Sequence, residues 1–141
     1  MSNTTNGTAR YALSTTVSTS VDSAATMTRG ALAEQGFGIL TEIDLAATLR
    51  DKIGVDIPPY LILGACRPPL AHAAVTADPS IGLLLPCNVV VRADGERTVV
   101  EAMDPATMVA LSGNVALAAV ADDARTRLLA ALTALGGTPV S

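Results

Sequence analysis

The sequence of 141 residues contains very few aromatic side chains, with one Phe, two Tyr and no Trp. Aromatic side chains are a main stacking platform for single-stranded nucleic acid, so the chain has almost no residues for this mode of binding. It also lacks runs of Lys or Arg, and its formal net charge is −4. Because phosphate binding needs a basic surface, the composition argues against nucleic acid and against an anionic membrane surface as partners.

Long apolar segments are missing as well, and no segment reaches the length of a membrane span. The N-terminus has no basic region followed by an apolar one, which a secretory signal would need. Residues 1–8 are small and polar, and we expect them to form a disordered tail ahead of a single domain at 9–137. The expected location is the cytoplasm, where the two cysteines would be thiols rather than a structural disulfide.

Half of the residues are hydrophobic, as in a globular domain, and their spacing alternates between strand and helix periods. Strands are predicted at 10–18, 37–43, 60–65, 88–93 and 98–103, with a short extended piece at 81–85. Helices are predicted at 21–35, 45–53, 68–77, 104–111 and 114–135. This order predicts an α/β (α+β) domain in which a compact mixed β-sheet packs with helices in two or three layers.

Alternation within residues 37–43 assigns each side chain to a face of its strand. The face that carries Phe37 and Ile39 is expected to include Thr41 and Ile43 as well. Glu42 would then lie on the opposite face. Asp44 follows the strand and is expected to cap the next helix.

The two cysteines, Cys66 and Cys87, each lie next to a predicted strand end and close to proline. If the two strands are neighbours, the thiols could form a redox disulfide, a sulfur-transfer site or a soft-metal site for Cu(I) or Zn. Arg67 and the helix that starts at Pro68 would lower the pKa of Cys66. The alternative is that both cysteines are buried as small apolar groups, since the sequence has no CxxC motif.

Three polar residues near the cysteines are further candidates for binding a ligand. Glu42 could act as a general base or hold a ligand, or it could simply face solvent. Tyr60 could turn its hydroxyl into a pocket, or it could be a core residue with its polar tip at the surface. Asn88 could orient a ligand or fix a loop. His72 is the only histidine and is expected to be exposed, so a metal site built from several histidines is excluded.

Several segments together resemble the DUF302 family. They are residues 36–44 (GFGILTEID), Pro59-Tyr60, Gly64-Ala65-Cys66 with Pro68, residues 81–89 (IGLLLPCNV) and residues 101–105 (EAMDP). The similarity extends over about residues 11–135 and implies a small α/β domain of the TT1751-like fold, often a homodimer, without implying a function. Arg67 departs from the pattern, in which the residue after this cysteine is commonly Asn.

Three hypotheses for the function follow. The first is a domain that handles a thiol or a small ligand at a site formed by Cys66, Cys87 and Glu42, with Tyr60, Asn88 and Arg67 as further candidates. The second is a non-catalytic dimeric binding or structural module with buried cysteines. The third is a soft-metal carrier that uses the two thiolates. The sequence identifies no cofactor and does not decide whether the chain is an enzyme.

Overall fold

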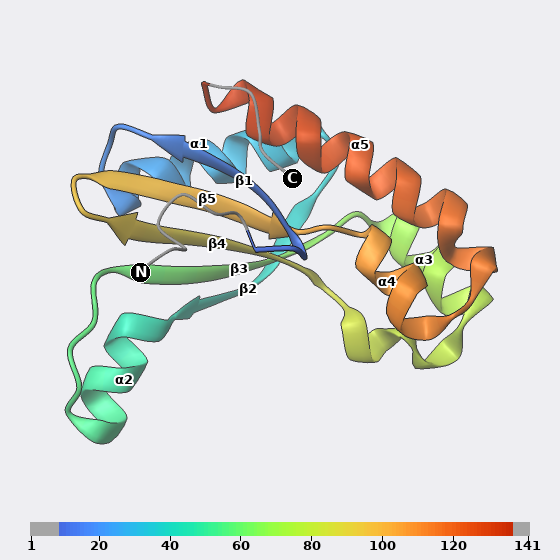
Figure 1. The fold of residues 1–141 in the computed structure, drawn as a ribbon, viewed down its shortest axis with the longest axis horizontal. Coiled ribbons are helices and arrows are strands. Elements are labelled where there is room, and N and C mark those ends of the chain that lie inside the picture. Colours follow the sequence, from blue (N-terminus) through green and yellow to red (C-terminus); the bar gives the residue numbers. More distant parts are fainter. Residues whose placement is uncertain (1–8, 137–141) are drawn as a thin grey trace.

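The computed structural model describes residues 9–136, which form one sheet with helices beside it and at one of its ends (Figure 1). The strands are β1 (Ala12–Val17), β2 (Gly38–Asp44), β3 (Tyr60–Cys66), β4 (Cys87–Asp94) and β5 (Arg97–Met103). The helices are α1 (Val21–Glu34), α2 (Leu45–Ile53), α3 (Pro68–Ala77), α4 (Ala106–Ser112) and α5 (Ala118–Ala134), with 3-10 helices η1 (Pro79–Leu84) and η2 (Val115–Leu117). The predicted tail at 1–8 and residue 137 of the predicted domain lie outside the described residues.

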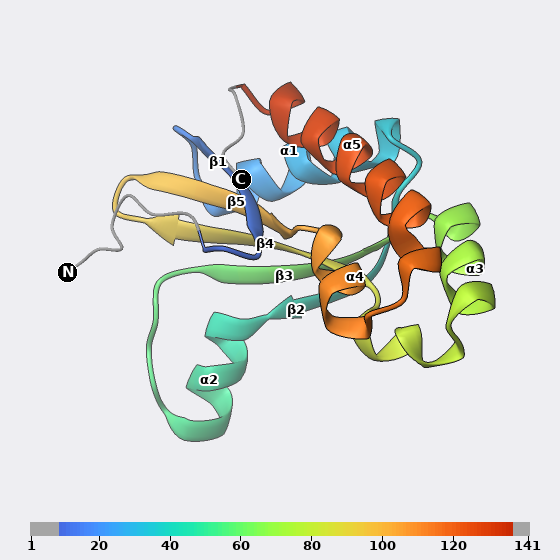
Figure 2. The same ribbon diagram turned by 45° about the vertical axis from the view of Figure 1, so that its right-hand side comes forward.

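The five strands are arranged in the order β1-β5-β4-β3-β2, and all neighbours are antiparallel. The α/β class is therefore confirmed, whereas the expectation of a mixed sheet is wrong. Helix α1 connects β1 and β2, which lie at opposite edges of the sheet. Helix α3 and η1 lie beyond the sheet end, so the chain returns from them in the antiparallel direction (Figure 2).

The main hydrophobic core lies between the sheet and helices α1 and α5. Both helices lie on the same side of the sheet (Figure 1). Alternate residues of the central strands, such as Leu63, Val89 and Val91, are at most 1% exposed. They meet Leu32 of α1 and Leu128 of α5, so removal of these apolar side chains from water stabilises the layer.

A β-bulge interrupts strand β2 and changes which residues share a face. Ile39 lies opposite Ala65, whereas Thr41 lies opposite Gly64, and the register shifts between them. The expectation that Thr41 and Ile43 share the face of Ile39 is therefore wrong, because the extra residue of a bulge reverses the alternation.

A second hydrophobic cluster lies beyond the end of the sheet. It contains Ala74 of α3, Ile81 of η1, Met108 of α4 and residues of η2 and α5. The extended piece expected at 81–85 is instead the last part of η1 and its cap. The Asp78 side chain accepts a hydrogen bond of 3.1 Å from the Ser80 amide, and Pro79 follows it at the first helical position, so both residues favour a helical start.

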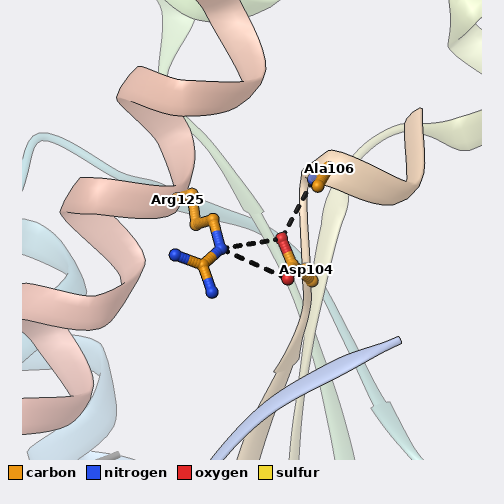
Figure 3. A network of polar contacts seen from close by, with 3 residues as sticks. All are labelled: Asp104, Ala106 and Arg125. Carbon is orange, nitrogen blue, oxygen red and sulfur yellow. Dashed lines mark hydrogen bonds and ion pairs between the residues drawn. The ribbon is translucent and has the colours of Figure 1, made fainter. Parts of the chain in front are cut away.

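Asp104 lies between the sheet and the second hydrophobic cluster, at the point where β5 passes into α4 (Figure 3). Its carboxylate accepts a hydrogen bond of 3.0 Å from the Ala106 amide. Both of its oxygens lie 3.2 Å from Nε of Arg125 in α5. These contacts hold α5 against the start of α4, so the same helix covers the sheet and extends over the second cluster.

Candidate functional site

A cavity of about 240 Å³ lies between the two hydrophobic clusters. Its wall combines residues of the sheet core, such as Phe37 and Ala65, with residues of the second cluster, such as Ala74 and Met108. Leu40 also lines it and is 65% exposed, so the cavity reaches the surface. Cys66, Arg67, Leu70, Ala71, Leu85, Pro86, Cys87, Val120 and Ala124 complete the lining.

Both cysteines line this cavity as free, partly buried thiols. The strands that carry them are neighbours, as the thiol hypotheses require, and Ala65 pairs directly with Cys87. Burial, and secondarily the nearby Cys66, raise the pKa of the Cys87 thiol from 9.0 to about 11. The Cys87 sulfur is therefore protonated at neutral pH, and as a protonated thiol it is a weak nucleophile.

Arg67 is the one charged residue among the described residues that line the cavity. It connects the last residue of β3 to the first residue of α3. Its Nε is buried and has no hydrogen-bond partner in the part of the chain that the structure describes. A methyl group on Gly36 would come within 2.9 Å of this Nε, so the glycine leaves the space in which Arg67 lies.

Gly64 supports the same region from within β3. It is buried, and a methyl group at this position would lie 2.9 Å from Cγ of Pro86 and even closer to Oγ1 of Thr41. Real Cβ atoms do not approach other atoms this closely. The glycine therefore lets β2 and Pro86, which lines the cavity after a cis peptide bond, pack on both sides of β3.

The structure brings together only three of the six candidate residues, namely Cys66, Arg67 and Cys87. Glu42 was expected on the face opposite Ile39, and this is wrong: after the bulge it shares the α1 side of the sheet with Ile39, where it forms an ion pair with Arg29. Tyr60 lines a separate hollow with residues of α2, at the end of β3 away from Cys66. Asn88 is exposed and is not part of the cavity wall.

Two residues outside the main candidates are placed as expected. Asp44 caps α2 by accepting a hydrogen bond of 2.9 Å from the Ala47 amide. His72 is exposed.

Most of the apolar wall was missed by sequence reasoning. Leu70 and Ala74 are four positions apart in α3, and Ala124 and Leu128 are four positions apart in α5, so each helix carries an apolar stripe. These stripes show that the residues face an interior. The sequence carries no signal that the helices enclose a space beside the cysteines, because that depends on how far α5 extends past the sheet.

Among residues 9–136, no three or more His, Cys, Asp or Glu side chains are grouped so that they could hold a metal ion. The two thiols and the thioether of Met108 are the sulfur atoms in the cavity wall. In the same part of the chain, no helix has the length and apolar character needed to cross a membrane.

Comparison with known proteins identifies the class to which this fold belongs. The family model described as "Domain of unknown function DUF302" matches residues 13–135, and the chain belongs to this family. The chain is also similar to the crystal structure of an uncharacterized conserved DUF302 protein from Bacillus stearothermophilus. That similarity has a TM-score of 0.84 and 28% identity, and it covers 90% of this chain and 99% of the other. No curated protein matches the sequence.

Proposed function

We propose that this domain binds a small, largely apolar molecule in the cavity lined by Cys66 and Cys87. The observation that carries this proposal is the cavity itself, which reaches the surface and whose lining is apolar except for Arg67 and the two thiols. Ligand sites are typically concave, with mostly apolar walls and a few polar groups that fix orientation. Its volume of about 240 Å³ lies below the usual range for drug-sized ligands, so it suits a smaller molecule.

Binding explains the state of the Cys87 thiol better than nucleophilic chemistry does. With a pKa of about 11, roughly one Cys87 in ten thousand is ionised at pH 7. Nucleophilic attack and soft-metal binding both require the thiolate. A protonated thiol instead offers a ligand a small, polarizable surface.

The proposal can be tested by NMR titration of the protein with six-carbon compounds, namely hexanol, hexanoate and hexylamine. We expect at least one of them to bind saturably and to shift the amide signals of Cys66, Cys87 and Ala74. Ala71→Phe places a ring in the cavity and should abolish this binding. Ala73→Phe is the matched control, because Ala73 lies on the same helix but is exposed and does not line the cavity.

Two results would contradict the proposal. One is that none of the three compounds binds saturably to the folded wild-type protein. The other is that Ala71→Phe and Ala73→Phe weaken binding equally, which would place the ligand outside the cavity. Circular dichroism of both variants shows whether a loss of binding comes from unfolding.

We also propose that the chain forms a homodimer, as the second hypothesis states. Ile43, Ile62 and Val90 form a row across three strands on the sheet face opposite α1 and α5, and Ile43 is 45% exposed. A second copy over this row would remove apolar surface from water. Sedimentation should give twice the chain mass, and Ile43→Arg should give one chain mass. A wild-type monomer at every concentration would contradict the proposal.

The cytoplasmic location remains part of this proposal. It is supported by the two free thiols in one cavity wall, which a reducing compartment would preserve. Fractionation of the source cells with an antibody against the chain tests it, and recovery outside the cytoplasmic fraction would contradict it.

A further inference from the structure

We infer that the ligand of the cavity is a short apolar carboxylate whose anionic head pairs with Arg67. This inference rests on the proposed function, because it specifies the ligand of the same site. Its starting point is that the cavity wall contains one cation and, among the described residues, no anion to balance it.

Arg67 differs from the other arginines in its contacts. Apart from Arg10, which is exposed, every other arginine of the described chain has a side-chain partner. These are Arg29 with Glu42, Arg50 with Asp56, Arg92 with Glu101, Arg97 with Thr16, Arg125 with Asp104 and Arg127 with Asp123. Arg67 has no such partner among these residues, and its Nε is a buried donor without an acceptor.

Nε of Arg67 is covered by neighbouring protein atoms, so a ligand in the cavity would pair with the terminal nitrogens of the guanidinium rather than with Nε. The guanidinium group is planar and presents parallel N–H groups, which match the two oxygens of a carboxylate. The space beside Gly36 keeps the arginine in position, because any side chain at Gly36 would crowd Nε.

The start of α3 does not add a second group for the anion. Pro68 and Pro69 have no amide hydrogen, and the amides of Leu70 and Ala71 already donate to the carbonyl of Arg67 at 3.0 Å. Arg67 would therefore bind the anion without help from the helix. A single negative charge is balanced by this arrangement, whereas a dianionic phosphate would leave charge without a partner beside an apolar wall.

The rest of the cavity wall determines the polarity and size of the remainder of the ligand. Phe37, Leu70, Met108 and Val120 provide apolar surface, and Ala124 leaves space between them. If each non-hydrogen atom takes about the 30 Å³ that a water molecule occupies in the liquid, the cavity holds about eight such atoms. Hexanoate has this size, and an acid with a much longer chain would extend into solvent.

Calorimetric titration of the full chain with hexanoate, hexanol and hexyl phosphate tests the inference. We expect hexanoate to bind about tenfold to hundredfold more tightly than hexanol, the ratio expected for hydrogen bonds to a charged group. Arg67→Gln should reduce that ratio to less than about threefold. Arg50→Gln is the matched control, because Arg50 lies in α2, away from the cavity, and should leave the ratio unchanged.

The outcomes separate the inference from the proposed function. Equal affinity of wild-type protein for hexanoate and hexanol would overturn the carboxylate and leave the cavity as a binding site. Tighter binding of hexyl phosphate than of hexanoate would overturn the single-charge argument. If none of the three compounds binds and hexylamine does not bind either, the proposed function fails along with the inference. The comparison of hexanoate with hexanol on wild-type protein needs no variant, so it tests the inference even if Arg67→Gln does not fold. In that case Arg67→Lys tests whether a positive charge without the planar guanidinium is sufficient.

Discussion

Replacement of Gly64 by alanine tests the close packing of β2, β3 and Pro86 beside the cavity. The added methyl group would meet Cγ of Pro86 at 2.9 Å and the Thr41 hydroxyl at a shorter distance, so both neighbours must move. Insertion of a methyl group into a packed site typically costs about 1–3 kcal/mol. Thr41 lies on an exposed edge strand and can rotate, which places the cost in the lower part of that range.

The same substitution also has a favourable component. Alanine restricts the unfolded chain relative to glycine and thereby contributes about 0.4–1 kcal/mol of stability where the backbone allows it. We therefore expect Gly64→Ala to lower the free energy of unfolding by about 0.5–1.5 kcal/mol in total. With an unfolding entropy of about 2.1 cal/mol/K per residue, a chain of 141 residues loses about 3 °C in Tm for each kcal/mol. The expected decrease is about 2–5 °C.

Differential scanning calorimetry of wild type and variant measures this shift. Gly30→Ala is the matched control, because a methyl group at Gly30 in α1 meets nothing within 4 Å. It should raise Tm, since alanine is the better helix residue by about 1 kcal/mol. A Gly64→Ala protein with a Tm equal to or above that of the wild type would refute the packing around β3.

Three further predictions concern the cavity and its supports. The folded protein favours the protonated Cys87 thiol, as its raised pKa shows. The resulting stabilisation of about 2–3 kcal/mol is fully present below pH 9 and should be lost as the pH rises to about 11. Urea unfolding should therefore show the stability difference between wild type and Cys87→Ala shrinking between pH 9 and 11, and a constant difference would contradict the burial of the thiol. Asp104→Ala should cost about 1–3 kcal/mol in urea unfolding. Asp123→Ala removes a partly exposed pair within one helix and should cost less than about 0.5 kcal/mol; equal costs would show that Asp104 does not anchor α5. In competition with a chelator, we expect the protein to retain no Cu(I), because Cys87 keeps its proton. Retention of one equivalent of Cu(I) by the wild type, lost in Cys66→Ser, would instead favour the soft-metal carrier.

Local structure followed from the sequence wherever a single segment determined it. The apolar run that begins at Tyr60 predicted a strand buried in the sheet, and β3 occupies Tyr60–Cys66. Asp44 predicted the start of α2, and its side chain caps that helix. These features depend on hydrophobic period and capping chemistry, which neighbouring residues specify. The strand directions and the bulge at Leu40 depend on pairing between distant segments, and the sequence did not predict them.

The candidate site was predicted in part for the same reason. Cys66, Arg67 and Cys87 were identified by unusual residue types beside strand ends, and the structure places them in one cavity wall. Tyr60 was a candidate because its hydroxyl could reach a pocket, but it lies at the opposite end of β3 from Cys66. A strand rises about 3.3 Å per residue, so the two residues are separated by about 20 Å along β3. The bulge reverses the alternation of β2, so the face assigned to Thr41 and Ile43 could not be read from the sequence.

The scarcity of large side chains explains why a cavity exists where the two hydrophobic clusters meet. Four alanines, Ala65, Ala71, Ala74 and Ala124, line it, and Phe37 is its only aromatic lining residue among those described. Leucine or phenylalanine at these positions would fill the space, and filling a cavity usually adds stability. The small residues at this junction therefore make the protein less stable than larger residues would. This is typical of a site that is retained for binding rather than for folding. On this argument Ala124→Leu should raise Tm and abolish binding of hexanoate, and a variant that is more stable but still binds would contradict it.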